Sequence, residues 1–195
     1  MRGLLTVLTG PSGVGKNTIC TALLERFKPL GAVKTVSSTT RQPRVGEEED
    51  GVHYHFLSRE VFERQIAQGD FLEYAPYGAN LYGTNRRMLE RLLEQSRLVI
   101  ADLEIKGCRQ LKEKGINPLI CPIIPDDVAV LEQRIRARPG VREADVVNRL
   151  AEAVREVTAI TSGEFGPPII NCRDRIGEAI DEIQRRIEIR LSKRR

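Results

Sequence analysis

Apolar and polar positions alternate along the chain in two rhythms. Short runs that are apolar throughout predict buried strands, and they cover residues 4–9, 32–38, 98–102, 117–124 and 168–172. Between them, apolar residues recur at spacings of three and four, which predicts helices over 17–27, 58–68, from 85, from 103 to 114, from 126, from 143 and over 176–191. Buried strands that alternate with helices indicate an α/β fold, in which helices cover both faces of a parallel sheet.

One segment, from about residue 37 to 84, departs from this rhythm. Residues 41–52 are polar and rich in Pro, Gly and acidic side chains, which predicts a loop. Short strands are expected at 53–57, 71–77 and 81–83. We therefore predict an insertion beside the main sheet that holds a substrate.

Local signals refine the helices. Ser58, Asn85 and Asp126 precede three of them, and a side-chain oxygen at such a position accepts a hydrogen bond from the first helical turn. On the helix that begins near 143, the spacing predicts an inward face made of four residues, Val147, Leu150, Val154 and Val157.

Composition narrows the function. The chain has 195 residues, 41% hydrophobic and 30% charged, which predicts one globular domain. Its net charge of +4 suits an anionic small ligand as well as nucleic acid. Aromatic residues make up only 5% and Trp is absent, so few side chains could stack on nucleic-acid bases. We therefore expect no nucleic-acid partner.

The lengths of the apolar runs and the spacing of the cysteines predict where the protein resides and the state of its thiols. The longest apolar runs have five or six residues, whereas a membrane helix needs about 20, and the N-terminus has no signal core, so we expect a cytoplasmic protein without a membrane partner. The four cysteines form no C-x-x-C pair, which favours reduced thiols over zinc or disulfides. Two histidines exclude a multi-histidine metal site.

The strongest motif is GPSGVGKN, from Gly10 to Asn17. It matches G-x-x-x-x-G-K between an apolar strand and a helix, and departs only where Ser or Thr is expected after the lysine. Glycines let backbone N–H groups turn around a phosphate, and the helix N-terminus adds positive partial charge. A plain glycine-rich turn with a solvated lysine is the alternative. Candidate ATP-binding residues are Gly10, Pro11, Ser12, Gly13, Val14, Gly15, Lys16, Asn17 and Thr18.

The residue after the lysine bears on the metal. A hydroxyl there would ligate Mg²⁺, and Asn17 replaces it. An amide oxygen can also ligate, or Thr18 can substitute, so both are candidate Mg²⁺ ligands.

Four further motifs follow in order: SSTTRQPR from Ser37 to Arg44, GVHYHF around Tyr54, FLE ending at Glu73, and YGT from Tyr82 to Thr84. With the glycine-rich loop, this order resembles the guanylate kinase family from Leu4 to about Asn171. The resemblance implies a P-loop NTPase-type parallel sheet, a small inserted GMP-binding subdomain and a helical lid. It also implies that the enzyme transfers a phosphoryl group from ATP, with Mg²⁺, to GMP or dGMP. The corresponding boundaries are a core of 1–36, 86–133 and 158–195, an insertion of 37–85 and a lid of 134–157.

The resemblance implies a role for each matching residue. Arg41 and Arg44 would hold the acceptor phosphate, with hydroxyls donated by Tyr54 and Tyr82. The guanine-side residues would be Ser37, Glu73, Gly83, Thr84 and Asp102. The catalytic cations would be Lys16, Arg41, Arg134, Arg138 and Arg149, the last three in or around the lid. Asn171 would lie near the adenine.

Chemistry supports these roles independently. Joining two polyanions requires fixed cations, and arginine forks suit phosphate well. A carboxylate such as Glu73 accepts from both the ring N–H and the amine of guanine, whereas adenine would leave it unpaired. The acceptor is already anionic, so no general base is required.

Three positions depart from the family pattern: Asn17, Lys106 where glutamine is expected, and Cys172 where aspartate is common. Two of the implied roles have plainer alternatives. Asp102 can be a charge at the end of a strand without binding guanine, and Arg149 can be a solvated surface residue. Two alternative functions stay open, a non-catalytic binding module with this fold and a kinase of another small phosphorylated acceptor. The sequence leaves the oligomeric state open.

Overall fold

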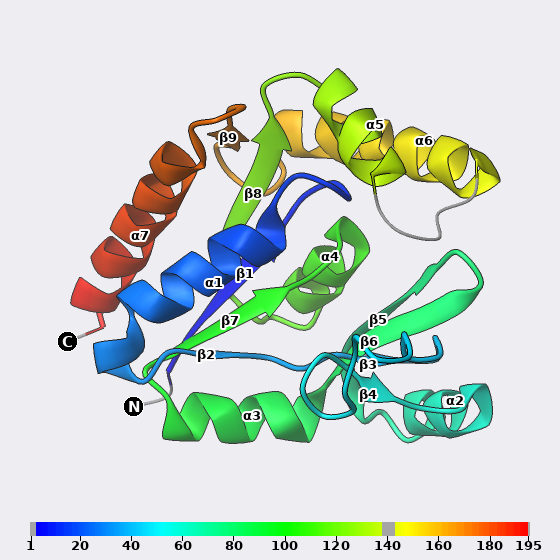
Figure 1. Ribbon diagram of the computed structural model, residues 1–195. Coiled ribbons are helices and arrows are strands. Elements are labelled where there is room, and N and C mark those ends of the chain that lie inside the picture. The colour runs from blue at the N-terminus through cyan, green and yellow to red at the C-terminus, as the bar shows by residue number, and fades with distance from the viewer. Residues whose placement is uncertain (1–2, 138–142, 195) are drawn as a thin grey trace.

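The computed structural model describes residues 3–137 and 143–194. Its larger sheet has five parallel strands in the order β2-β7-β1-β8-β9 (Figure 1). In chain order they are β1 (Leu4–Thr9), β2 (Val33–Lys34), β7 (Leu98–Asp102), β8 (Leu119–Pro125) and β9 (Ile169–Asn171). The central strand, β1, is buried along its whole length because its apolar residues face helices on both sides.

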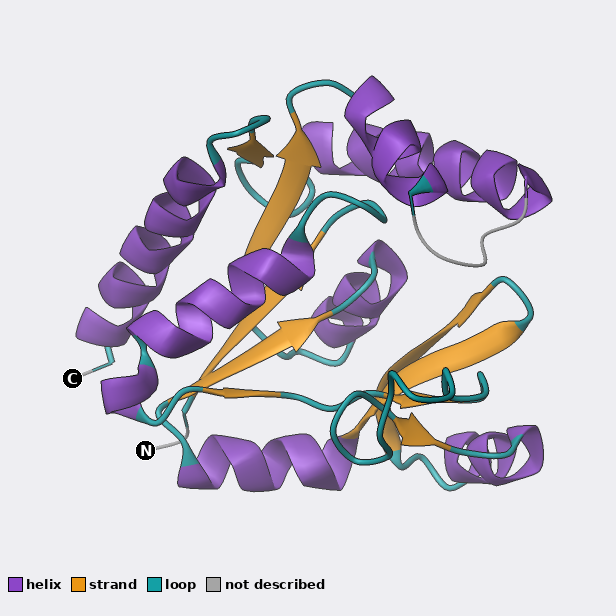
Figure 2. Ribbon diagram, viewed as in Figure 1, coloured by secondary structure: helices purple, strands orange, loops and turns teal. Residues whose placement is uncertain are grey.

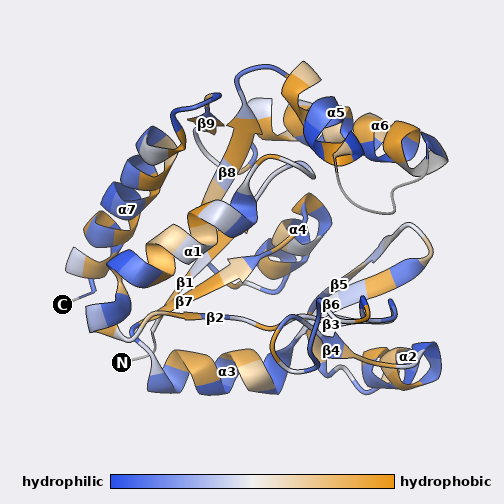
Figure 3. Cartoon of the chain, in the orientation of Figure 1, coloured by the Kyte–Doolittle hydropathy of each residue, from blue (hydrophilic) through white to orange (hydrophobic). Residues whose placement is uncertain are grey.

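Helices cover both faces of this sheet (Figure 2). Leu4 and Leu8 of β1 join one buried cluster with residues of α1 (Lys16–Arg26), α5 (Ala129–Arg136), α6 (Glu143–Thr161) and α7 (Ile176–Ser192). Leu5 and Val7 point the other way, into a cluster with α3 (Arg86–Gln95) and α4 (Ile105–Glu113). The short helix η1 (Lys28–Leu30) follows α1. Figure 3 shows the same arrangement as apolar strands between helices whose outer sides are polar.

A second, mixed sheet lies beside the first, in the order β4-β3-β6-β5. Its strands are β3 (Ser38–Thr39), β4 (His55–Phe56), β5 (Phe71–Tyr77) and β6 (Asn80–Asn85), and α2 (Arg59–Ala67) covers it by stacking Phe62 on Phe71 at 4.3 Å between ring centroids. The predicted fold class, a parallel sheet covered by helices with a smaller unit inserted, is confirmed.

The strand predicted over 32–38 is wrong in extent. Only Val33 and Lys34 pair within the large sheet, and the Thr35 amide adds one further bond to the carbonyl of Ile100, 2.9 Å away. The chain then crosses to the second sheet, where Ser38 and Thr39 form β3. Residues that favour strands fill both halves of this run, so the pattern alone could not reveal the crossing.

Two of the three predicted caps are confirmed. The side chains of Ser58 and Asn85 accept from the amides of Val61 and Met88. The cap predicted at Asp126 is wrong, because α5 begins only at Ala129, whose amide donates to Asp127 Oδ1 at 2.8 Å. The Asp126 carboxylate instead accepts from the amide of Arg173.

The inward face predicted for α6 is wrong at two of its four positions. Val147 and Val154 are 59% and 51% exposed, whereas Val146 and Ala153 are buried. At these two turns the buried residue is the one before the predicted position, because apolar residues are adjacent at 146–147 and 153–154 and either member of each pair satisfies a helical repeat.

Two predictions about composition can be compared with the structure. In the described ranges, no helix is long and apolar enough to cross a membrane. Cys20, Cys108, Cys121 and Cys172 are all free thiols, as expected from their spacing.

Candidate nucleotide-binding site

The glycine-rich loop of residues 10–15, called the phosphate loop after its predicted role, joins the carboxyl end of β1 to α1. Lys16 opens the helix, and its ammonium donates to the carbonyl of Gly10 at 2.5 Å and lies 3.4 Å from the carbonyl of Pro11. Asp102, at the carboxyl end of the neighbouring strand β7, lies 3.8 Å from the same ammonium. The first-turn amides and Lys16 thus lie where backbone donors and a cation can surround a phosphate.

Gly15 is required at the end of this loop for two reasons. Its φ of 98° is left-handed, and a Cβ there would lie 2.9 Å from Nδ2 of Asn171. That amide nitrogen donates to the carbonyl of Val14 at 2.7 Å, while Asn171 Oδ1 has no hydrogen-bond partner in the described residues. The structure thus places Asn171, predicted to lie near the adenine, in the interior against the loop.

The other predicted donor-side residues lie around the loop to different extents. Arg134, near the end of α5, donates from Nη1 to the carbonyl of Gly13 at 3.1 Å. Asn17 and Thr18 are exposed on the first turn of α1, and Arg149 is half-buried on α6. Arg138 lies outside the described residues.

A group of carboxylates lies within electrostatic range of Lys16. Burial raises the pKa of Glu104 and of Glu156 to about 7, and nearby carboxylates add to the rise, whereas Lys16 and Lys106 oppose it. Glu104 precedes α4 and Glu156 belongs to α6, so this group joins the sheet edge to the predicted lid. Sequence reasoning missed both residues: the acidic pattern after β7 offered a signal for Glu104, but none existed for Glu156.

On the second sheet, Arg41 forms a compact cluster with aromatic rings. Its guanidinium carbon lies 5.5 Å from the ring centre of Tyr54 and 5.7 Å from that of Phe56, and Tyr54 meets Tyr82 edge-on at 5.9 Å. Burial raises the pKa of Tyr54 from its ordinary value of 10.0 to about 12, with Asp102 adding to the rise, so the phenol remains a hydrogen-bond donor well into the alkaline range. Arg44 is exposed nearby in sequence.

Glu73 is held on β5 by contacts to α4. The neighbouring residue Tyr74 exchanges two hydrogen bonds with the Gln110 side chain, at 3.1 and 2.7 Å, and Lys114 donates to the carbonyl of Leu72. The carboxylate between them is 5% exposed, and a Cβ on Gly107 would lie 2.6 Å from its Oε2. Only glycine therefore lets α4 approach the carboxylate so closely.

The electrostatics and neighbours of Glu73 follow from this packing. Burial raises its pKa above the ordinary value, while Thr84 and Lys114 act in the opposite direction. Thr84 is its partner in the strand register, Gly83 pairs with Ser38 of β3, and the Ser37 carbonyl accepts from the amide of His55. The predicted guanine-side residues of the second sheet therefore come from adjacent strands.

Asp102 is the predicted residue that links the two regions. It lies 3.8 Å from the Lys16 ammonium, and its charge also acts on the Tyr54 phenol. Figure 1 shows the phosphate loop on the side of the large sheet that faces α5, α6 and the second sheet.

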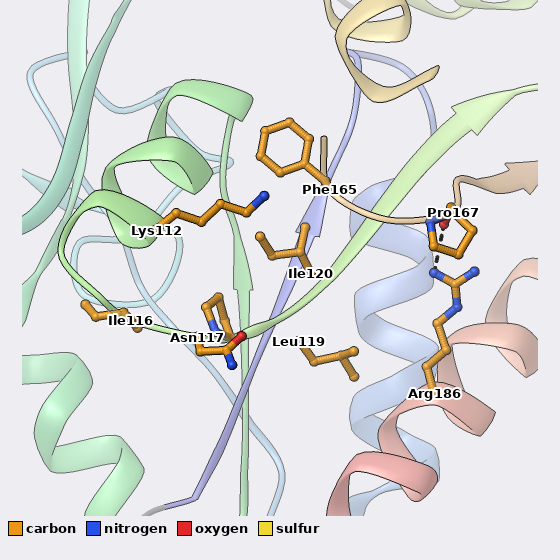
Figure 4. A pocket seen from close by; sticks show the side chains of 9 residues that line it. Lys112, Ile116, Asn117, Leu119, Ile120, Phe165, Pro167 and Arg186 are labelled. Atoms are coloured by element: carbon orange, nitrogen blue, oxygen red, sulfur yellow. Dashed lines mark hydrogen bonds between the residues drawn. The ribbon is translucent and has the colours of Figure 1, made fainter. Parts of the chain in front are cut away.

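A pocket of about 370 Å³ lies elsewhere, at the amino end of β8 (Figure 4). Apolar side chains line much of it, together with Lys112 and Arg186. The Lys112 ammonium lies 4.6 Å from the ring centre of Phe165, and Arg186 donates to the carbonyl of Pro167 at 2.9 Å. Both cations already have partners within the chain, so this pocket is not the candidate site.

The described residues include no group of three or more His, Cys, Asp or Glu side chains that could hold a metal ion. The oxygen donors beside the phosphate loop are those of Asn17, Thr18 and the carboxylates near Lys16. Mg²⁺ commonly binds through one or two protein oxygens together with water and substrate phosphates. The donor set therefore fits a metal that arrives with a nucleotide.

A parallel sheet with a glycine-rich loop and lysine at the end of its central strand defines a P-loop nucleotide-binding protein. The family model for guanylate kinase matches residues 2–190. The chain belongs to the guanylate kinase family.

Individual relatives agree. The guanylate kinase of Clostridium perfringens is 38% identical over 94% of this chain and 82% of its own length. The human guanylate kinase is 37% identical over 96% of this chain and 93% of its own length. A crystal structure of guanylate kinase from Anaplasma phagocytophilum superposes with a TM-score of 0.74, at 25% identity, over 97% of this chain and 87% of that one.

Proposed function

We propose that this chain transfers the terminal phosphoryl group of ATP to GMP or dGMP, with ATP at the phosphate loop and the acceptor at the second sheet. Guanylate kinase activity itself, the phosphorylation of GMP, follows from membership of the family. One observation supports the assignment of sites: Asp102 lies between two separate clusters, 3.8 Å from the Lys16 ammonium and within electrostatic range of Tyr54, which packs against Arg41.

The donor site uses backbone more than side chains. We assign the ATP phosphates to residues 10–18, where the loop amides and Lys16 surround them. Arg134 already lies against the loop and would add a second cation. With Arg138 and Arg149, it belongs to the proposed lid, residues 134–157. We assign Asn171 to the donor side as well, where its amide orders the loop.

The acceptor site uses side chains. We assign the acceptor phosphate to Arg41, Arg44, Tyr54 and Tyr82, and the proposed acceptor-binding unit to residues 37–85. Guanine would be recognised by Ser37, Glu73, Gly83, Thr84 and Asp102. A buried carboxylate at Glu73 favours a base that offers two donors side by side, because an acceptor base without them would leave the charge unpaired.

The chemical step needs positioning rather than proton removal. The attacking atom is an anionic phosphate oxygen, so cations bring the two polyanions together and stabilise charge on the transferring group. We propose that Lys16 and the lid arginines supply this stabilisation, while closure excludes water. Mg²⁺, which Asn17 and Thr18 would help to hold, neutralises phosphate charge when it is bound with ATP.

An acceptor panel tests this proposal. Purified protein with ATP and Mg²⁺ would be assayed with GMP, dGMP, AMP, CMP and UMP, following nucleoside diphosphate formation. We expect turnover with GMP and dGMP, and at least about 1000-fold lower kcat/KM with AMP. Turnover that ignores GMP would identify a kinase of another acceptor, and absence of turnover with every acceptor would favour a binding module.

A further inference from the structure

The side chain of Glu48 is the most closely held carboxylate of the 41–48 loop. Its Oε1 accepts from Nη2 of Arg41 at 2.7 Å, and its Oε2 accepts from Nη1 at 2.8 Å, so the pair is bidentate. The same Oε2 accepts from the backbone amide of Arg44 at 2.9 Å. Only 10% of the Glu48 side chain is exposed, and these donors lower its pKa to about 2.

Arg41 is fixed from its other sides as well. Nη1 also donates to the carbonyl of Gln42 at 2.8 Å, and the guanidinium stacks near the rings of Tyr54 and Phe56. A bidentate carboxylate fixes both the plane and the rotation of a guanidinium, which a single contact does not. Arg41 is thus ordered before any ligand arrives.

The neighbouring acidic residue provides a contrast. The Glu47 side chain is 59% exposed, and its carboxylate lies 4.0 Å from the guanidinium of Arg44. An exposed pair at that distance contributes little to structure. Two adjacent glutamates therefore differ in burial, in geometry and in the arginine that they face.

A second interpretation of Glu48 is a placeholder for the acceptor phosphate, displaced when GMP binds. The contacts argue against it. Glu48 also holds the amide of Arg44, and the amides of Glu47 and Glu48 both donate to the carbonyl of Arg44 at 3.1 Å, so the carboxylate closes the turn that carries both arginines. Displacing it would open the turn at the moment when both arginines are needed.

We propose that Glu48 is a positioning residue for acceptor recognition: it orients the Arg41 guanidinium and closes the 41–48 turn, so that both arginines face the acceptor phosphate together. This inference rests on the proposed role of Arg41 in binding that phosphate. It assigns to Glu48 an effect on the acceptor alone, transmitted through Arg41.

The test is steady-state kinetics of Glu48→Gln, which keeps the shape of the side chain and removes its charge. We expect the KM for GMP to rise about tenfold, while kcat and the KM for ATP stay within about twofold. Glu48→Asp, which keeps the charge but withdraws it by one methylene, should raise the KM for GMP by a smaller factor. Glu47→Gln is the matched control and should leave all three constants within about twofold.

A double-mutant cycle with Arg41→Ala separates positioning from general loop damage. If Glu48 acts through Arg41, Glu48→Gln should have no further effect on the KM for GMP in the Arg41→Ala background. The same rise in both backgrounds would overturn the inference, as would an unchanged or lower KM for GMP in the single variant. The Arg41→Ala single variant tests the proposed function separately. If its KM for GMP is unchanged, the proposed role of Arg41 is refuted, whatever the Glu48 variants show.

Discussion

The phosphate loop and the 41–48 loop hold their proposed anion-binding groups by opposite means. The first is a backbone structure: glycine conformation, the start of α1 and the buried amide of Asn171 shape it, and the apolar strand β1 anchors it. The second is a side-chain structure, in which Glu48 and aromatic rings orient Arg41 on short, partly exposed strands.

The difference shows where each site is vulnerable. In the phosphate loop most side chains contribute little, and a change at Lys16 or at a glycine should be severe. Around Arg41 the backbone needs a left-handed residue only at Gly46, whose φ is 78°, and acceptor binding should depend mainly on the charged side chains, with Glu48 acting through Arg41. The predictions below test this contrast, beginning with the largest expected effect.

Replacing Lys16 should have the largest effect. Lys16→Ala removes the cation of the phosphate loop, and we expect kcat/KM to fall by about 100-fold or more because charge on the transferring group loses its stabilisation. Lys28→Ala, at an exposed lysine of η1, is the control and should be neutral. A near-normal rate in Lys16→Ala would show that the loop does not hold the donor phosphates.

Replacing Glu73 should have a smaller and more selective effect. Glu73→Gln should raise the KM for GMP by about tenfold or more and change the KM for ATP far less, because a neutral amide cannot accept two hydrogen bonds from guanine. Glu63→Gln, on the exposed side of α2, is the control. Equal changes in both KM values would contradict guanine recognition by Glu73.

The pH dependence sharpens the same test. Burial raises the pKa of Glu73, so the carboxylate is lost at a higher pH than an exposed glutamate would be. In the unmodified enzyme, the KM for GMP should therefore rise as pH falls toward the raised pKa. This rise should be smaller in Glu73→Gln, which retains only the protonation of the GMP phosphate, whose second pKa is about 6, as measured by steady-state kinetics from pH 8 down to pH 5.

The smallest effect concerns stability rather than catalysis. Glu156 has a folded-state pKa of about 7, above its ordinary value of 4.5, so the folded protein retains a proton that the unfolded chain releases. The resulting stabilisation is complete below about pH 4.5 and is lost as pH rises through about 7. Glu156→Gln should therefore stabilise the protein by about 1 kcal/mol at pH 8 and by much less at pH 5.

Denaturant unfolding at the two pH values measures this effect. Glu94→Gln, at an exposed position of α3, is the control and should show no such pH dependence. Equal stability changes for Glu156→Gln at pH 5 and pH 8 would contradict a raised pKa of Glu156 in the folded protein.

The sequence was most informative where chemistry is local. The phosphate loop could be predicted because its glycines and Lys16 fall within seven residues, 10–16, that follow a strand and lead into a helix. The caps at Ser58 and Asn85 were equally local. Predictions that depended on tertiary geometry fared worse: the chain crosses between sheets after Lys34, and α6 turns Val146 inward instead of Val147.

The acceptor side shows the same limit. Arg41 and Glu73 belong to recognisable motifs, whereas the residues that fix them do not. Glu48 contacts Arg41 seven positions earlier in the same loop, and Gly107 approaches Glu73 from α4. Motif spacing does not identify such partners, because the first contact depends on how the 41–48 loop folds and the second on how α4 meets the second sheet.

The tether of Lys16 to the carbonyl of Gly10 has a consequence for how nucleotide arrives. A lysine side chain free in solvent samples many rotamers, and a ligand that captures it must suppress them all. Here the ammonium is already confined over its own loop, so an incoming phosphate exchanges one oxygen partner for another and disorder changes little. At Lys16 itself, donor binding should therefore cost little side-chain entropy, so ordering of the proposed lid would account for most of the entropy lost.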